Sequence, residues 1–337
     1  MPGLLPDVDP DGLLEYSVVF TDRSLNHMSG TFQRVMLDIS ATLKHVYSAA
    51  AAVVVPGGGT YGMEAVARQF ATGQRCLVIR NGWFSYRWSQ ILEQGGIASD
   101  ITVMKARRTG DGPQAPFAPA PLEEVVAAIE ADRPGVVFAP HVETSAGMML
   151  PDDYIRAVAD AVHAAGGLFV LDCIASGEVW VDMRATGVDV LISAPQKGWS
   201  ASPCSGLVML GKAALERIEA TQSSSFACDL RKWLEIMQAY ENGGHAYHAT
   251  MPTDGLRTFR DVMKETEAPP GVVIEIIGER ELLRTLMPDL VRHIEALREK
   301  FPGIPVAIVS HGAEQFLMTS SSAAKAPDTH QLVQSLV

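Results

Sequence analysis

Residues 168–172 read LFVLD, an unbroken apolar run that ends in an acid. A short apolar run of this kind is typical of a strand that is covered on both faces. An acid at the end of such a strand is costly unless it meets a partner. The stretch therefore predicts a buried strand that ends in Asp172. It leaves two interpretations of the acid: a structural acceptor of backbone N–H groups, or a carboxylate that faces a cationic ligand.

Strand and helix patterns alternate on both sides of this stretch. Strands are expected at 52–55, 76–79, 101–104, 135–139, 188–193 and 206–210, and helices at 31–49, 63–71, 84–95, 122–131, 152–165, 213–221 and 230–239, with a loop at 109–121. This alternation predicts an α/β fold, a mostly parallel sheet with helices on both faces. Ligands of such sheets bind beyond the carboxyl ends of the strands.

The composition is that of a globular protein, with 337 residues, 47% apolar, 20% charged and a net charge of -12. The acidic balance argues against a nucleic-acid surface, which needs clustered Lys and Arg. The four cysteines show no metal-type pairing, so we expect reduced thiols, no metal centre and a cytoplasmic protein. The first residues lack the pattern of a secretory signal, and no apolar run reaches the roughly 18 residues of a membrane span.

A lysine follows another predicted strand. Residues 190–199 read VLISAPQKGW, so Lys197 comes just after the strand expected to precede it. A desolvated lysine has a lowered pKa and can form a Schiff base. The competing interpretation is an exposed loop lysine.

A glycine turn lies between the first predicted strand and the helix after it. Residues 56–60 read PGGGT. Glycines let the backbone approach a ligand closely, and a helix N-terminus offers free N–H groups to a phosphate. The alternative is a plain turn between a strand and a helix.

In their order and spacing, these three features resemble the class V aminotransferases of fold type I, the alanine–glyoxylate and serine–pyruvate group, over about residues 14–263. The resemblance implies the fold of a fold type I transferase that uses pyridoxal 5′-phosphate. Lys197 would carry the cofactor, Gln196 would contact its phosphate and Asp172 would face its pyridine nitrogen. The site residues implied are Lys197 and Asp172 for catalysis, and Gly58, Gly59, Thr60, Phe84, Thr144, Asp172, Gln196, Lys197, Tyr247 and Thr250 for cofactor binding.

Two further segments extend the resemblance at the cofactor ring. Residues 81–84, NGWF, match a segment whose aromatic stacks on the ring, which is Phe84 here where many relatives have tryptophan. Residues 141–147, HVETSAG, match a run in which Thr144 would lie on the ring-hydroxyl side.

A third segment implies a homodimer with shared active sites. Residues 247–252, YHATMP, look like the family segment that reaches the neighbouring subunit, so Tyr247 and Thr250 would touch the phosphate of the partner's cofactor. An ordinary polar loop is the alternative. His27 matches a histidine near the substrate entrance, although a lone histidine is more often structural.

The resemblance ends at about residue 264. The family's Arg-Ile/Leu-Gly motif, whose arginine grips the substrate carboxylate, has no counterpart here. Arg257 and Arg260 are conceivable substitutes, but helix-surface charges are the commoner interpretation. We expect an N-terminal arm (1–30), a large cofactor-binding domain (31–264) and an atypical or truncated C-terminal segment (265–337). In that segment, 271–277 and 305–312 read as strands and 281–300 as a helix.

The resemblance implies transfer of an amino group from alanine or serine to glyoxylate or pyruvate. Two alternatives stay open. One is a cofactor-binding protein without turnover, because the usual substrate-binding domain is missing. The other is a lyase or desulfurase reaction, which Gln196 disfavours because desulfurases usually carry histidine at that position.

Overall fold

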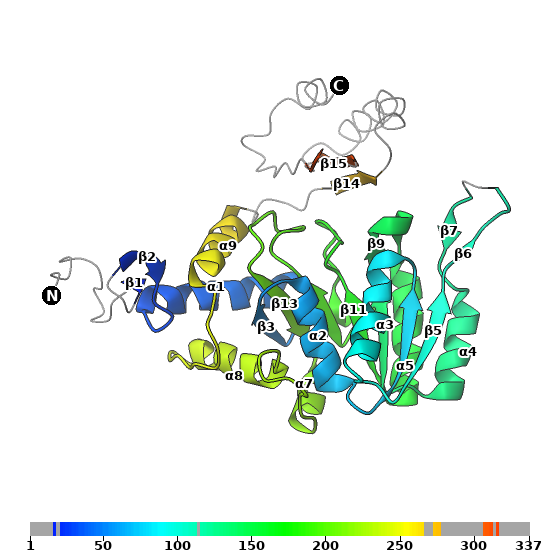
Figure 1. Cartoon of the computed structure of the whole chain (residues 1–337), viewed down its shortest axis with the longest axis horizontal. Helices are drawn as coiled ribbons and strands as arrows, with labels where there is room; N and C mark the ends of the chain where they lie inside the picture. The colour runs from blue at the N-terminus through cyan, green and yellow to red at the C-terminus, as the bar shows by residue number, and fades with distance from the viewer. Residues whose placement is uncertain are drawn as a thin grey trace, which may run out of the picture.

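The computed structural model describes residues 16–17, 21–112, 115–265, 272–277, 306–312 and 315–316. Its centre is a seven-stranded sheet, ordered β3 (Ala51–Pro56), β13 (Ser205–Leu210), β12 (Val190–Ser193), β11 (Leu168–Asp172), β8 (Val136–Pro140), β4 (Arg75–Arg80) and β5 (Asp100–Lys105) (Figure 1). The helices are α1 (Gly30–Val46), α2 (Gly59–Phe70), α3 (Trp83–Gln94), α4 (Leu122–Asp132), α5 (Asp152–Ala165), α6 (Met183–Thr186), α7 (Lys212–Glu219), α8 (Leu230–Glu241) and α9 (Thr253–Glu265).

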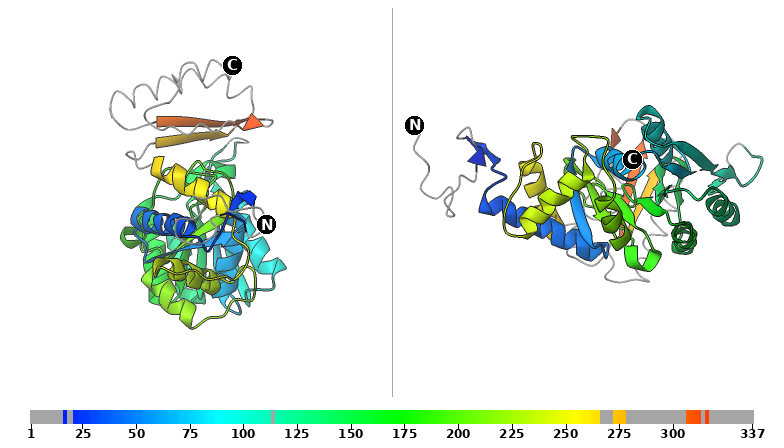
Figure 2. Two further views of the ribbon diagram at one scale, coloured as in Figure 1. Left: turned by 90° about the vertical axis from the view of Figure 1, so that its left-hand side faces the viewer. Right: turned by 90° about the horizontal axis from the view of Figure 1, so that it is seen from below.

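The sheet confirms the predicted α/β architecture with one exception in strand direction. Neighbouring strands from β12 to β5 pair in parallel, whereas β13 is antiparallel to both β12 and β3. Helices α2 and α3 lie on one face of the sheet, and α4, α5 and α6 lie on the other (Figures 1 and 2). The central strands are buried along their whole length, as continuous apolar runs between two helical layers require.

Local signals explain where several helices begin and end. Ser29 caps α1 by accepting a hydrogen bond from the Phe32 amide. Asp229 caps α8 by accepting one from the Lys232 amide. Helix α5 ends at Gly166, whose φ of 79° is the left-handed conformation that glycine adopts without strain. Short polar side chains at the starts and a glycine at the end thus set these boundaries.

The helix expected at 63–71 begins earlier than predicted, at Gly59. The glycines read as a turn because glycine is a poor helix former. However, a first-turn residue needs no intrahelical acceptor for its amide. Gly59 and Thr60 therefore form the first turn of α2, rather than a loop ahead of it.

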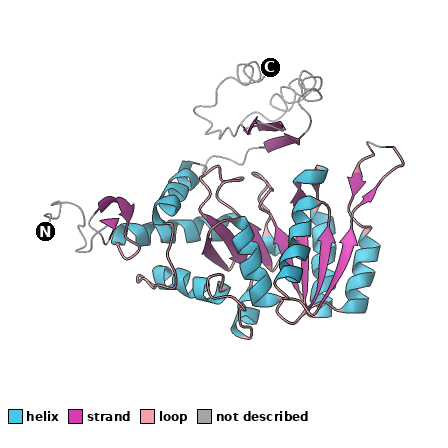
Figure 3. Cartoon of the chain, in the orientation of Figure 1, coloured by secondary structure: helices cyan, strands magenta, loops and turns pink. Residues whose placement is uncertain are grey.

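Small ladders lie outside the central sheet (Figure 3). They pair β1 (Tyr16–Ser17) with β2 (Thr21–Leu25), β6 (Arg107–Arg108) with β7 (Phe117–Ala118), and β9 (Val142–Glu143) with β10 (Met148–Met149). The 3-10 turn η1 (Thr144–Ala146) connects β9 to β10. Within the loop expected at 109–121, residues 117–118 form the second strand of a short hairpin.

In the C-terminal segment the two expected strands are present. They are β14 (Val272–Ile277) and β15 (Val306–Gly312), which pair in parallel, and β16 (Gln315–Phe316) adds an antiparallel edge. The helix expected at 281–300 lies outside the described residues. The division into an arm, a large domain and an atypical C-terminal segment stays a prediction.

All four cysteines are buried and unpaired. Within the described ranges, no helix is long and apolar enough to cross a membrane, and no three His, Cys, Asp or Glu side chains are grouped so that they could hold a metal ion.

Candidate functional site

The candidate residues gather at the carboxyl edge of the sheet because five strands end there in the same direction. The glycine turn follows β3, the 81–84 segment follows β4, and the 141–147 segment follows β8. Asp172 is the last residue of β11, opposite Pro140 of β8, and Lys197 lies in the connection after β12. Sequence positions far apart are thus brought together at the edge where open sheets bind ligands.

The glycine turn is held tightly against the antiparallel strand β13. The Gly57 amide donates to the Cys204 carbonyl at 3.0 Å, and Gly57 has a φ of 120° that favours glycine. A Cβ on Gly206 would lie 2.8 Å from the Gly58 carbonyl and 2.9 Å from the Gly62 Cα. The start of α2 therefore packs backbone against backbone on β13, which fixes the position of its free amides.

Asp172 lies beside this helix start, inside the protein. It is 8% exposed, and its Oδ1 accepts the Ile174 amide at 3.0 Å. Ile174 in turn packs on Gly59, where a Cβ would come within 2.6 Å of its side chain. Burial raises the pKa of Asp172 to about 6, against the opposing charges of Arg87 and Lys197. The carboxylate thus accepts one backbone hydrogen bond, and the charges of Arg87 and Lys197 act on it.

Lys197 and Gln196 lie in the turn after β12. The Lys197 side chain is exposed in the single chain, so the desolvation expected from the sequence is not observed in it. Its carbonyl accepts the Ser200 amide at 2.9 Å, which closes the turn. The Oε1 of Gln196 is buried and has no hydrogen-bond partner among the described residues. Such an orphaned amide end is expected of a side chain that completes its bonds with a ligand.

A buried carboxylate that the sequence analysis did not single out, Glu143, holds the Phe84 segment. It accepts the Phe84 amide at 3.1 Å, the Ser85 amide at 2.9 Å and the Ser85 hydroxyl at 2.6 Å, and also the Ser145 hydroxyl at 2.6 Å. Burial alone would raise the pKa of Glu143, but the hydrogen bonds from Ser145 and Ser85 outweigh it and hold the pKa below its usual range. The positive end of the helix dipole at the N-terminus of α3 also stabilises this anion.

We expect Glu143→Ala to destabilise the protein by about 2–4 kcal/mol, because it leaves the first amides of α3 without an acceptor. Glu143→Gln, which keeps one acceptor, should cost about half as much. Urea unfolding of the cofactor-free protein measures both changes. The matched control is Glu216→Ala, an exposed glutamate of α7, for which the change should stay within about 0.5 kcal/mol. Equal midpoints for the Glu143 and Glu216 variants would contradict this role.

Phe84 and Arg87 lie one turn apart on α3, on the same side of the helix. The Phe84 side chain is 38% exposed, and the Arg87 guanidinium lies 5.6 Å from its ring centroid. The Nη1 of Arg87 donates to the Thr60 hydroxyl at 3.2 Å. Arg87 therefore joins α3 to the start of α2. No local sequence pattern predicts this contact.

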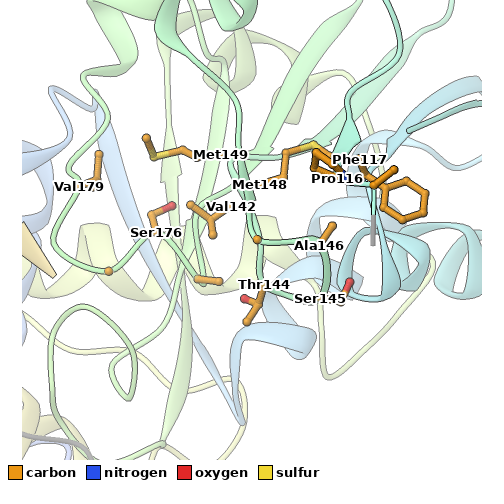
Figure 4. Close-up of a pocket in the computed structure, with 14 residues that line it drawn as sticks. Pro116, Phe117, Val142, Thr144, Ser145, Ala146, Met148, Met149, Ser176 and Val179 are labelled. Carbon is orange, nitrogen blue, oxygen red and sulfur yellow. The ribbon is translucent and has the colours of Figure 1, made fainter. Parts of the chain in front are cut away.

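Thr144 borders a cavity of about 550 Å³ (Figure 4). None of its lining residues carries a charge; they are Ala115, Pro116, Phe117, Val142, Thr144, Ser145, Ala146, Gly147, Met148, Met149, Ala175, Ser176, Gly177 and Val179. The Ser176 hydroxyl bonds the Nδ1 of His141 at 2.7 Å. Burial lowers the pKa of His141 to about 4, so this histidine is neutral at pH 7.

Other candidates lie apart from the sheet edge in the single chain. Tyr247 and Thr250 are exposed in the loop between α8 and α9, and the Tyr247 ring packs 5.6 Å from the ring of His27. In the described chain, no hydrogen bond or ring contact links Tyr247 or Thr250 to the residues at the edge. Arg257 and Arg260 are charges on α9, as expected: Arg257 pairs with Asp254, and Arg260 pairs with Asp38 and Asp261.

The residues at the edge fit pyridoxal phosphate. This cofactor needs three kinds of group. They are a buried carboxylate with an oxygen left for the pyridinium N–H, a side-chain amide without a partner beside a lysine, and a helix start held in place by close backbone contact. We infer that Asp172, Gln196, Lys197 and the first turn of α2 would hold it, with Phe84 and Thr144 at its ring.

Comparison with known proteins agrees with the fold. The chain is similar to a crystal structure of alanine–glyoxylate aminotransferase from Nostoc sp., with 24% identity, a TM-score of 0.60 and coverage of 71% of this chain and 61% of the other. It is also similar to an aspartate aminotransferase of subgroup IV from Thermus thermophilus, with 27% identity, a TM-score of 0.58 and coverage of 72% and 64%.

Curated relatives are aminotransferases of several kinds. The chain is 28% identical to an L-aspartate–glyoxylate aminotransferase of Paracoccus denitrificans (66% of this chain, 55% of the relative). It is 28% identical to alanine–glyoxylate aminotransferase 1 of Saccharomyces cerevisiae (72% and 64%). It is 29% identical to a 2-aminoethylphosphonate–pyruvate transaminase of Syntrophobacter fumaroxidans (76% and 66%). The chain thus spans between about half and two thirds of the length of these relatives.

The family model of the class V aminotransferases matches residues 13–268, which is most of the chain and includes the whole sheet edge described above. The family implies pyridoxal phosphate as cofactor. The fold and the family match agree, and the chain belongs to the class V aminotransferase family.

Proposed function

We propose that this chain catalyses the pyridoxal-phosphate-dependent transfer of an amino group from alanine or serine to glyoxylate or pyruvate. The observation that carries the proposal is the buried Asp172 carboxylate at the same sheet edge as Lys197 and the pinned start of α2. These three groups match the nitrogen, the aldehyde and the phosphate of the cofactor.

In this reaction the residues of the chain would have separate roles. Bound pyridoxal phosphate supplies an electron sink for the charge that develops at the substrate Cα. Asp172, as a carboxylate, would hold the pyridine N–H and keep it protonated. The Nζ of Lys197 would accept the proton of the substrate Cα as a general base. The amides of Gly59 and Thr60 would bind the phosphate and fix the ring.

We place the donor side chain in the cavity at Thr144, which has no charged lining residue and therefore favours a donor whose side chain is uncharged. Aspartate and 2-aminoethylphosphonate carry a second anionic group, and a site for that group needs a cation that the lining residues of this cavity do not supply. Alanine or serine brings only a small side chain, which the Thr144 and Ser176 hydroxyls and the surrounding apolar groups can accept.

The proposal includes a homodimer in the cytoplasm. The exposed Tyr247 and Thr250 would complete the phosphate site of a partner subunit, and their exposure in the single chain supports this role. The location is supported by four cysteines that are all unpaired.

The test is the visible spectrum of the purified protein with pyridoxal phosphate, before and after each of four donors: L-alanine, L-serine, L-aspartate and 2-aminoethylphosphonate. We expect L-alanine or L-serine to convert the bound cofactor to its amine form, and glyoxylate or pyruvate to restore it. D-Alanine is the matched control and should leave the spectrum unchanged. A response to aspartate or aminoethylphosphonate alone would refute the proposed donor but keep the aminotransferase activity.

Cofactor binding without turnover is the second candidate function. It is favoured by one observation, namely that Arg257 and Arg260 are both engaged with carboxylates of the chain. A protein that binds pyridoxal phosphate but does not respond to any amino donor would establish it. Release of pyruvate and ammonia from L-serine, or of sulfide from L-cysteine, would instead indicate a lyase or desulfurase reaction.

A further inference from the structure

The Thr60 hydroxyl at the start of α2 is held by a cation from a different helix. The Nη1 of Arg87 on α3 donates to the Thr60 Oγ at 3.2 Å, and the rest of the guanidinium lies over the Phe84 ring. Within the described residues, Arg87 forms no ion pair with a carboxylate at 4.0 Å or less. Its charge is therefore not neutralised by direct contact with an acid, although it lies close enough to Asp172 to lower the pKa of that carboxyl.

A hydroxyl that accepts a hydrogen bond from a cation can still act as a hydrogen-bond donor. It has one proton to donate, and it can rotate that proton toward any acceptor nearby. Arginine cannot accept a hydrogen bond, so the bond from Arg87 uses a lone pair of the Thr60 oxygen and leaves its proton unused. The Thr60 proton is then free for an acceptor on the side of the free α2 amides, where the helix start favours an anion.

We propose that Arg87 is a positioning residue that sets the Thr60 hydroxyl as a hydrogen-bond donor to the cofactor phosphate. This inference rests on the proposed function, because it needs pyridoxal phosphate in the site. Arg87 acts through Thr60, and its charge strengthens the donor, since hydrogen bonds that involve an ionised group are roughly twice as strong as neutral ones.

The placement of Arg87 depends on features already described. Glu143 fixes the first turn of α3, and Arg87 lies on the next turn of that helix. The contact of Gly206 with Gly58 and Gly62 fixes the first turn of α2. The two helix starts are thus separately anchored, one by Glu143 of β9 and the other by Gly206 of β13, and the bond between Arg87 and Thr60 links them.

The test compares two ligands, pyridoxal 5′-phosphate and pyridoxal, which differ only in the phosphate. Dissociation constants are measured by absorbance for the wild type, Arg87→Met, Arg87→Lys, Thr60→Val and the double variant Arg87→Met/Thr60→Val. We expect Arg87→Met to weaken pyridoxal phosphate binding by about 10- to 100-fold and to change pyridoxal binding less than about threefold. Arg87→Lys should retain part of the affinity. Arg156→Met, an exposed arginine of α5, is the matched control.

The double variant tests whether Arg87 acts through Thr60. We expect Arg87→Met to add little to the loss already caused by Thr60→Val, because the hydroxyl that Arg87 orients is gone. Fully additive losses would overturn the inference and show that Arg87 attracts the phosphate directly rather than through Thr60. Equal losses for pyridoxal and its phosphate would overturn it as well, since Arg87 would then act on the fold or on Asp172.

The result for the wild type separates this inference from the proposed function. If the wild type binds pyridoxal phosphate and Arg87→Met binds it equally well, only the role of Arg87 fails. If the wild type binds neither ligand, the proposed function fails, and this inference fails with it. Arg87→Lys guards against misfolding, because it keeps the charge and most of the side-chain length.

Discussion

Lys197→Ala is expected to lower the rate of amino transfer by about 10⁴-fold or more, because the variant loses both the group that carries the cofactor and the base at the substrate Cα. The fold should be unaffected, since the lysine side chain is exposed and the turn around it is closed by backbone hydrogen bonds. Single-turnover conversion of the cofactor by L-alanine measures the rate.

The control for this variant is Lys212→Ala, an exposed lysine at the start of α7, which should keep wild-type rates. Added ethylamine should restore part of the activity of Lys197→Ala, because a free amine can replace the missing base. Wild-type turnover in Lys197→Ala would remove the lysine from the mechanism, whatever the cofactor content of the protein.

Asp172→Asn is expected to lower turnover by about 10²-fold or more and, at neutral pH, to stabilise the cofactor-free protein. The rate falls because the pyridine nitrogen loses an anionic partner worth about 3 kcal/mol in the transition state. The stability rises because burial lifts the pKa of Asp172 from 3.8 to about 6. Below pH 4 the carboxyl is protonated in both the folded and the unfolded state, and its burial carries no cost from ionisation. As the pH rises through 6 the carboxyl ionises in the folded protein and stability is lost, which asparagine avoids.

Urea unfolding at pH 4 and at pH 7.5 measures the stability effect. We expect the asparagine variant to exceed the wild type by up to about 3 kcal/mol at pH 7.5, and by little at pH 4. Asp160→Asn, an exposed aspartate of α5, should show no such pH dependence. A difference that is equal at both pH values would mean that the ionisation of Asp172 is not its cause.

The parallel strands and their covering helices were predictable from the sequence because apolar runs and helical spacing are local properties. The direction of β13 was not, since an apolar run reads the same for either direction and only its pairing with β3 and β12 decides. The start of α2 was placed too late, because the low helix propensity of glycine conceals a first turn that is stabilised by packing against Gly206.

The position of Asp172 and of the glycine turn at one sheet edge was predictable, because Asp172 ends a strand and the turn follows one. Glu143 and Arg87 could not be assigned a role, because their importance lies in contacts between segments distant in sequence. The exposure of Lys197 also differs from the expectation for a desolvated amine. Burial of a loop side chain depends on what covers it, which strand and helix patterns do not specify.

The capping of α3 by Glu143 has a consequence for the order in which the chain can acquire its native structure. The carboxylate and the Ser85 amide are 58 residues apart, and the strands that precede them, β8 and β4, are paired in the sheet. During synthesis, the segment that carries Phe84 and Arg87 therefore emerges from the ribosome well before the group that completes its first turn. Folding of this half of the sheet must wait for a long-range closure, and such closures slow folding.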